Sequence, residues 1–372
     1  MTRLGFYVHV PFCSVRCGYC DFNTYTASEL GGGGSQAEYA GWAVREIESS
    51  TALLTGRPVD TVFFGGGTPT LLPVDDLIAM LAAIDRVHGL APRAEVTTEA
   101  NPDSVTPDSL ARLREGGFDR VSFGMQSAVP AVLRTLDRTH DPERVPAVVE
   151  WARAAGFDQV SLDLIYGTPG ESADDWQRSL DVALACSPDH ISAYSLIVED
   201  GTRLARSVRR GEIPMPDEDD LADKYVQADE TLESAGLRWY EVSNWARDEA
   251  AECRHNLGYW RSDDWWGVGP GAHSHLAGER WWNVKHPRAY AQRLGAGDTP
   301  VADRETLDEE TRHTERVLLE VRLREGMPLE LADAKAIDAV VADGLGTVGR
   351  GRLVLTRRGR LLADHVVRRL LD

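Results

Sequence analysis

Three cysteines lie within eight residues near the start of the chain, Cys13, Cys17 and Cys20, in the spacing C-x3-C-x2-C. Thiolates are soft ligands that suit iron and sulfide, and three on one short loop can hold three irons of a four-iron cube. The fourth iron is then open to a small molecule. Zinc is the competing assignment, but a structural zinc site takes four ligands, and the two other cysteines stand alone in the sequence.

Four more chemistry-bearing residues follow predicted strands: Gly66, Glu99, Gln126 and Asp163. Like Cys13, each lies at or just beyond the carboxyl end of its strand. In parallel barrels this edge carries the catalytic and binding groups. The periodicity therefore predicts that these residues meet at one rim, next to the cysteines.

The elements that must position them alternate along the chain. Short β-branched and apolar runs predict strands, and apolar residues at helical spacing predict the helices between them. Such alternation demands right-handed crossovers and a parallel sheet, here a partial (β/α)6 barrel. The predicted strands are 5–11, 61–64, 95–100, 120–125, 159–165 and 190–197, and the helices are 37–54, 75–88, 106–115, 129–136, 145–155 and 173–186. The glycine run 31–35 predicts a flexible linker.

The last part of the chain has a different pattern of predicted elements. After about residue 300, helical patterns at 307–323 and 329–342, a strand-like run from Leu353 and a last helix at 360–371 resemble a winged helix. We therefore expect a barrel domain over 1–299 and a winged-helix-like domain over 300–372. The second is rich in arginine and could bind DNA, but fold alone does not confer that function, and an accessory role at the barrel or at a partner is favoured.

The cysteine loop and five further motifs resemble the radical S-adenosylmethionine (SAM) superfamily, in the branch of oxygen-independent coproporphyrinogen III oxidases and HemW-type haem chaperones. The resemblance covers nearly the whole chain. Its motifs are Tyr7 to Cys13 with Asp21-Phe22-Asn23, the glycines 65–67 with Thr68, Glu99 to Pro102, Gly124 to Ser127, Asp163 to Gly167, and His255 to Trp260.

The resemblance implies a [4Fe-4S] cluster on Cys13, Cys17 and Cys20, with SAM on its open iron. It also implies two groups of SAM contacts. The first group is Tyr7, Tyr19, Gly66, Gly67, Thr68 and Glu99. The second group, whose counterparts in the oxidase contact a second SAM, is Gln126, Arg138 and Asp163. Without the resemblance, the glycines could form a tight turn, the tyrosines could be packed aromatics, and the charged residues could form a salt bridge at the rim.

The aromatic-rich region 250–285 combines histidines that could ligate haem iron with rings that could stack on a macrocycle. In haem chaperones of this family the His of H-N-x-x-Y-W is associated with haem, which makes His255 the candidate ligand. The alternative is that the region forms a lid over the barrel mouth, with His255 a hydrogen-bonded structural residue.

Two departures from the oxidase pattern favour the chaperone. Phe22 stands where the oxidase has a further cysteine, and only Met1 to Leu4 precede the first strand, where the oxidase has an extension. We therefore expect a protein that passes haem to an acceptor protein and needs an electron donor for its cluster. The alternatives are coproporphyrinogen oxidation or another radical SAM reaction, such as methyl or methylene transfer.

Composition limits the remaining possibilities. The formal charge of −19 disfavours a nucleic-acid surface across the chain. No apolar run of membrane-spanning length and no signal peptide occur in the 372 residues. A thiolate cluster also needs a reducing compartment, so we expect a cytoplasmic protein.

Overall fold

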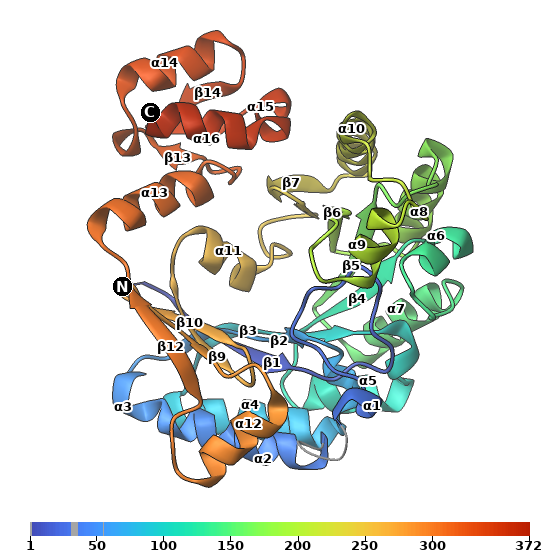
Figure 1. Cartoon of the computed structure of the whole chain (residues 1–372), viewed down its shortest axis with the longest axis vertical. Coiled ribbons are helices and arrows are strands. Elements are labelled where there is room, and N and C mark those ends of the chain that lie inside the picture. Colours follow the sequence, from blue (N-terminus) through green and yellow to red (C-terminus); the bar gives the residue numbers. More distant parts are fainter. Residues whose placement is uncertain (1, 31–35, 55) are drawn as a thin grey trace.

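The computed structural model describes residues 2–30, 36–54 and 56–372, so the predicted glycine linker, 31–35, lies outside the described residues. A sheet of twelve strands dominates the chain, and six neighbouring strands at its centre are parallel (Figure 1). These are β1 (Leu4–Val10), β2 (Val59–Gly66), β3 (Leu90–Ala100), β4 (Arg120–Gln126), β5 (Gln159–Tyr166) and β6 (His190–Ser195). The predicted parallel sheet is confirmed, strand by strand.

Helices follow these strands and cover the convex side of the curved sheet (Figure 1). Their starts follow local chemistry: Thr106 and Ser172 accept hydrogen bonds from the third residue of the helix that each precedes, which satisfies otherwise unpaired N–H groups. The helices are α1 (Ala27–Leu30), α2 (Gln36–Ser49), α3 (Thr51–Leu54), α4 (Val74–His88), α5 (Pro107–Glu115), α6 (Pro130–Thr135), α7 (Arg144–Ala155) and α8 (Ala173–Ala185).

Both ends of the sheet extend beyond the predicted strands. On the β6 side, β8 (Asn244–Ala246) and β7 (Arg238–Glu241) add antiparallel. On the β1 side, β9 (Asp264–Val268) is parallel to β1, and β10 (His273–Leu276), β11 (Glu279–Asn283) and β12 (Val301–Thr306) follow antiparallel. The aromatic-rich region therefore supplies three strands of the sheet, and β12, beyond residue 300, adds one more. The helices between these strands are α9 (Arg203–Arg209), α10 (Glu218–Ser234), α11 (Arg254–Trp260) and α12 (Pro287–Gly295).

The C-terminal residues have a core of their own, built from apolar side chains between Val317 and Leu370. A small antiparallel sheet in the order β13-β15-β14 packs with the helices. Its elements are α13 (Glu309–Glu320), β13 (Met327–Pro328), α14 (Ala334–Ala342), β14 (Gly346–Gly349), β15 (Arg352–Leu355), α15 (Arg357–Leu361) and α16 (Ala363–Leu371). We call residues 309–372 the C-terminal unit. Its assignment as a winged helix stays a prediction.

In the described ranges, no helix combines the length and the apolar character that crossing a membrane requires.

Candidate functional site

The cysteine loop leaves β1 at the rim of the barrel and is held at both ends by backbone hydrogen bonds. Cys13 N donates to Tyr25 O (3.0 Å), and Tyr25 N donates to Pro11 O (2.7 Å). All three cysteines are free and partly buried. Burial raises the pKa of Cys13 to about 11, against hydrogen bonds from Thr24 and Thr68, and the nearby Cys20 and Cys17 raise it further. The three sulfurs are therefore close enough to interact electrostatically.

The three thiols do not converge on one point. Within the described ranges, no three His, Cys, Asp or Glu side chains are close enough together to bind a single metal ion. A four-iron cube is wider than one ion, because each of its cysteines ligates a different iron.

The glycines at the end of β2 are required by the neighbouring loop. Gly67 N donates to Val10 O (2.8 Å), and a Cβ on Gly67 would lie 2.5 Å from Phe12 O. Gly66 has a φ of +103°, and its Cβ would meet the His9 ring at 2.4 Å. A side chain at either position would push the glycine turn away from the cysteine loop. Glycine is therefore needed at both positions because neighbouring parts of the protein itself, Phe12 O and the His9 ring, come this close.

Two carboxylates, Glu99 on β3 and Asp163 on β5, lie on the inner face of the barrel with β4 between their strands. Glu99 Oε2 accepts a hydrogen bond from Gly66 N (3.1 Å), and the Asp163 oxygens accept from Ser122 and Ser192, each at 2.7 Å. Burial, together with the charge of Asp163, raises the pKa of Glu99 to about 8. Burial also raises the pKa of Asp163, although the two serine hydroxyls oppose this rise. A cationic ligand would relieve the electrostatic repulsion between the carboxylates of Glu99 and Asp163.

Gln126 and Arg138 meet over Gly124, between the carboxylates and the cysteine loop. Arg138 donates to Gly124 O (2.8 Å) and to Cys17 Sγ (3.6 Å). Among the described residues, Arg138 Nε and Gln126 Oε1 are buried without a hydrogen-bond partner. Native proteins rarely leave such atoms unpaired, so these two are available to a polar ligand.

The two predicted tyrosines have different surroundings. The Tyr7 hydroxyl hydrogen-bonds with His9 Nδ1 (3.1 Å), and its ring stacks on Phe63 on the inner wall of the barrel. Tyr19 lies inside the loop, packed against a small apolar cluster around Leu136. Burial raises the pKa of the Tyr19 hydroxyl, and the charge of Cys17 adds to the rise.

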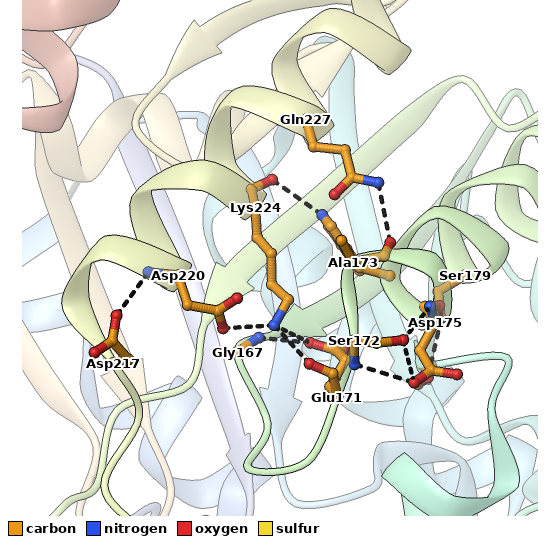
Figure 2. Close-up of polar contacts among 12 residues, drawn as sticks. Gly167, Glu171, Ser172, Ala173, Asp175, Ser179, Asp217, Asp220, Lys224 and Gln227 are labelled. Atoms are coloured by element: carbon orange, nitrogen blue, oxygen red, sulfur yellow. Dashed lines mark hydrogen bonds and ion pairs between the residues drawn. The ribbon is translucent and has the colours of Figure 1, made fainter.

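The loop after β5 is fixed by a buried ion pair from α10 (Figure 2). Lys224, 1% exposed, donates to Glu171 O (2.8 Å) and lies 3.8 Å from Glu171 Oε2. Glu171 Oε2 in turn accepts from Gly167 N (2.7 Å). This loop follows the strand that carries Asp163, so α10 stabilises one side of the rim.

Sequence reasoning missed two residues that hold the cysteine loop. His9 Nε2 hydrogen-bonds with Asn23 O (2.9 Å), and the Asn23 side chain donates to Pro270 O (2.9 Å) and Lys285 O (2.7 Å). Asn23 belongs to the Asp21-Phe22-Asn23 motif, which was a signal for it. Its partners, about 260 residues away, were not predictable from local pattern.

His255 lies below this rim, and its ring stacks on the rings of Phe63 (centroids 5.2 Å apart) and Tyr7 (6.4 Å). It sits on α11, near the amino ends of the strands, where its backbone N donates to Glu95 Oε1 (3.0 Å). The side chain is 4% exposed, and its two nitrogens hydrogen-bond with Thr61 Oγ1 and Tyr259 OH, each at 2.9 Å. Burial lowers the pKa of His255 to about 3. Coordination of iron by His255 would require one of these hydrogen bonds to break.

The comparisons with known proteins agree with this geometry. The model of the Radical SAM superfamily matches residues 7–183. "Heme chaperone HemW" of Mycobacterium tuberculosis is 54% identical over 99% of this chain and 94% of its own length. The protein of that name in Bacillus subtilis is 32% identical over 97% of each chain.

Among solved structures, coproporphyrinogen III oxidase (HemN) from Escherichia coli, a radical SAM enzyme, superposes with a TM-score of 0.85. The match covers 99% of this chain and 90% of the oxidase at 23% identity, so this likeness supports the fold alone. The matching family model, the near full-length relatives and the cysteine loop lead to one conclusion: the chain belongs to the HemW family of the radical SAM superfamily.

Proposed function

We propose that this protein is a haem chaperone that carries a [4Fe-4S] cluster, binds SAM and haem, and transfers haem to acceptor proteins. The observation that carries the proposal is its likeness, over nearly the whole chain, to proteins named heme chaperone HemW. The side chain of Phe22, which replaces the further cysteine of the oxidase pattern, is 57% exposed beside the loop. This favours the chaperone over coproporphyrinogen oxidation.

Membership of the radical SAM superfamily implies the cluster and SAM, and the residues present fit both. Cys13, Cys17 and Cys20 are free thiols on one loop and would hold the cluster. A bound cluster would supply one electron for the reductive cleavage of SAM, the chemistry that gives the superfamily its name.

The remaining rim residues would bind and orient SAM. Glu99 and Asp163 would accept hydrogen bonds from its cationic part, and the unpaired atoms of Gln126 and Arg138 would bind its polar groups. Tyr7, Tyr19, Gly66, Gly67 and Thr68 would form the wall around it. An electron donor and a haem acceptor complete the proposal, and we place the protein in the cytoplasm.

Anaerobic reconstitution tests the cluster. Single Cys→Ala substitutions at 13, 17 and 20 should each lower bound iron and sulfide severalfold. Cys186→Ala is the matched control, because Cys186 lies outside the loop on the end of α8 and should keep the wild-type content. Wild-type protein that takes up zinc but no iron would overturn the cluster assignment.

The same preparation separates the chaperone from the oxidase. We expect the loaded protein to bind haem, as a shift of the Soret band, and to leave coproporphyrinogen III unchanged when SAM and a reductant are supplied. Protoporphyrinogen formation at a rate far above that of a Cys17→Ala control would overturn the chaperone assignment in favour of the oxidase.

A further inference from the structure

The inner face of the barrel continues beyond SAM-contacting Tyr7 onto the added strands. In β9, Gly267 pairs with Tyr7, and in β10 and β11, His273 pairs with Trp282. A Cβ on Gly267 would lie 2.1 Å from His273 O, so the two strands are in close contact at this level. Tyr7, Gly267, His273 and Trp282 therefore form a continuous row across neighbouring strands. Figure 1 shows β9 and β10 as strands of this sheet, with α11 on its concave side.

His273 differs from the other histidines in and next to the aromatic-rich region. The two nitrogens of His255 and those of His275 are hydrogen-bonded, and both side chains are buried. His286 Nδ1 accepts from Arg288 N at the start of α12. The His273 ring is exposed, and no described residue hydrogen-bonds to its nitrogens. It offers a lone pair for coordination without rearrangement of the fold.

The surroundings of His273 suit a flat, anionic ligand. Trp282 stacks on its ring, with centroids 5.7 Å apart and an interplanar angle of 24°, so both rings can contact the edge or face of a macrocycle. Partial burial and the positive charges of Lys285 and Arg280 lower the pKa of His273, and the charge of Glu305 opposes this shift. Arg280 forms ion pairs with Glu305 and Glu315, whereas Lys285 has no ion pair among the described residues.

We propose that His273 coordinates the haem iron, with Trp282 against the macrocycle and Lys285 near a carboxylate. This inference rests on the proposed function and names the residues that bind the haem. A ring nitrogen donates its lone pair to the iron and displaces a weak axial ligand such as water; no proton or electron is transferred. Because the imidazole is exposed, the haem can leave for an acceptor without unfolding of the barrel. The adjacent Asn23, bonded to Lys285 O, connects this site to the cysteine loop.

Titration of haem into the full-length protein tests the proposal. His273→Ala should weaken haem binding at least about tenfold, as expected for loss of a metal ligand, and change the Soret and visible bands. Added imidazole should restore the wild-type spectrum in His273→Ala. Trp282→Leu should weaken binding while keeping the axial-ligand spectrum. His313→Ala, an exposed histidine on α13, should behave as wild type.

The outcomes distinguish this site from the function on which it rests. If the wild type binds no haem, the chaperone proposal fails. If the wild type binds haem and His273→Ala keeps its affinity and spectrum, the chaperone proposal stands and the site is wrong. Loss of binding in His255→Gln together with normal binding in His273→Ala would place the ligand on α11 instead. Unchanged circular dichroism in each variant shows that the fold is intact.

Discussion

Glu46 is a carboxylate on α2, 2% exposed and far from the cysteine loop in sequence. It accepts hydrogen bonds from Gly269 N, Asn283 and Tyr290, but no described cation pairs with it. Burial raises its pKa from the ordinary 4.5 to about 7, against these hydrogen bonds. Between about pH 4.5 and pH 7, Glu46 is therefore protonated in the native state and ionised in the unfolded state. The free energy of unfolding should fall as pH rises through this window.

Replacing Glu46 by Gln removes this titration. We expect the stability of the wild type relative to Glu46→Gln to fall by about 3 kcal/mol between pH 4.5 and pH 8, with most of the change below pH 7. Urea unfolding at a series of pH values measures it. Glu48→Gln is the control, because Glu48 lies on the same helix in an exposed ion pair with Arg86. Parallel pH profiles for the wild type and Glu46→Gln would contradict the prediction.

At the scale of elements, the six parallel strands were predictable because each alternates along the chain with a helical pattern and carries buried apolar residues at alternate positions, such as Val96 and Ala100 in β3. The added strands were not, because β7 to β12 are short, most of them mix aromatic and polar residues, and all but the β1–β9 pairing are antiparallel. Of the rim residues, Gly66, Glu99 and Gln126 lie at or next to the ends of their strands as predicted, whereas Asp163 lies three residues before the end of β5. The position of His255 depends on Glu95, 160 residues earlier in the chain, and no local pattern reveals that contact.

The contact between the glycine turn after β2 and the cysteine loop gives an element-scale prediction. Gly67→Ala should destabilise the protein by about 2 kcal/mol, the usual cost of overpacking, and should weaken SAM binding, because the loop must move. Gly41→Ala is the matched control. Gly41 lies on the exposed side of α2, where a Cβ meets nothing within 4 Å, so alanine should stabilise the helix by about 0.5–1 kcal/mol. Thermal unfolding of both variants measures the difference, and equal effects would contradict the role of the turn.

At the scale of the whole molecule, α10 connects the barrel rim to the C-terminal unit. Its Lys224 stabilises the loop after β5 (Figure 2), and its Asp229 accepts hydrogen bonds from Arg357 (2.6 Å) and Arg360 (2.7 and 3.0 Å) on α15. The Arg360 guanidinium also lies 4.3 Å from the Trp239 ring centroid on β7. Asp229 is thus one of several residues that attach the C-terminal unit to the rest of the chain, beside ion pairs such as Arg261–Glu325 and Arg324–Glu252, and it lies on the helix that also supports the rim.

Loss of Arg360 should therefore loosen the C-terminal unit before the barrel unfolds. In Arg360→Ala, Asp229 loses two hydrogen bonds and Trp239 loses its cation, and breaking one partner of a buried pair costs about 3 kcal/mol. We expect hydrogen exchange in α15 and the second half of α10 to accelerate at least about tenfold, which corresponds to about 1.4 kcal/mol. Arg358→Ala is the control, because Arg358 is exposed and donates only to Asp343 O within its own unit. Equal exchange rates in the two variants would show that the attachment depends on other contacts, since of the two substituted arginines Arg360 contacts Asp229 and Arg358 does not.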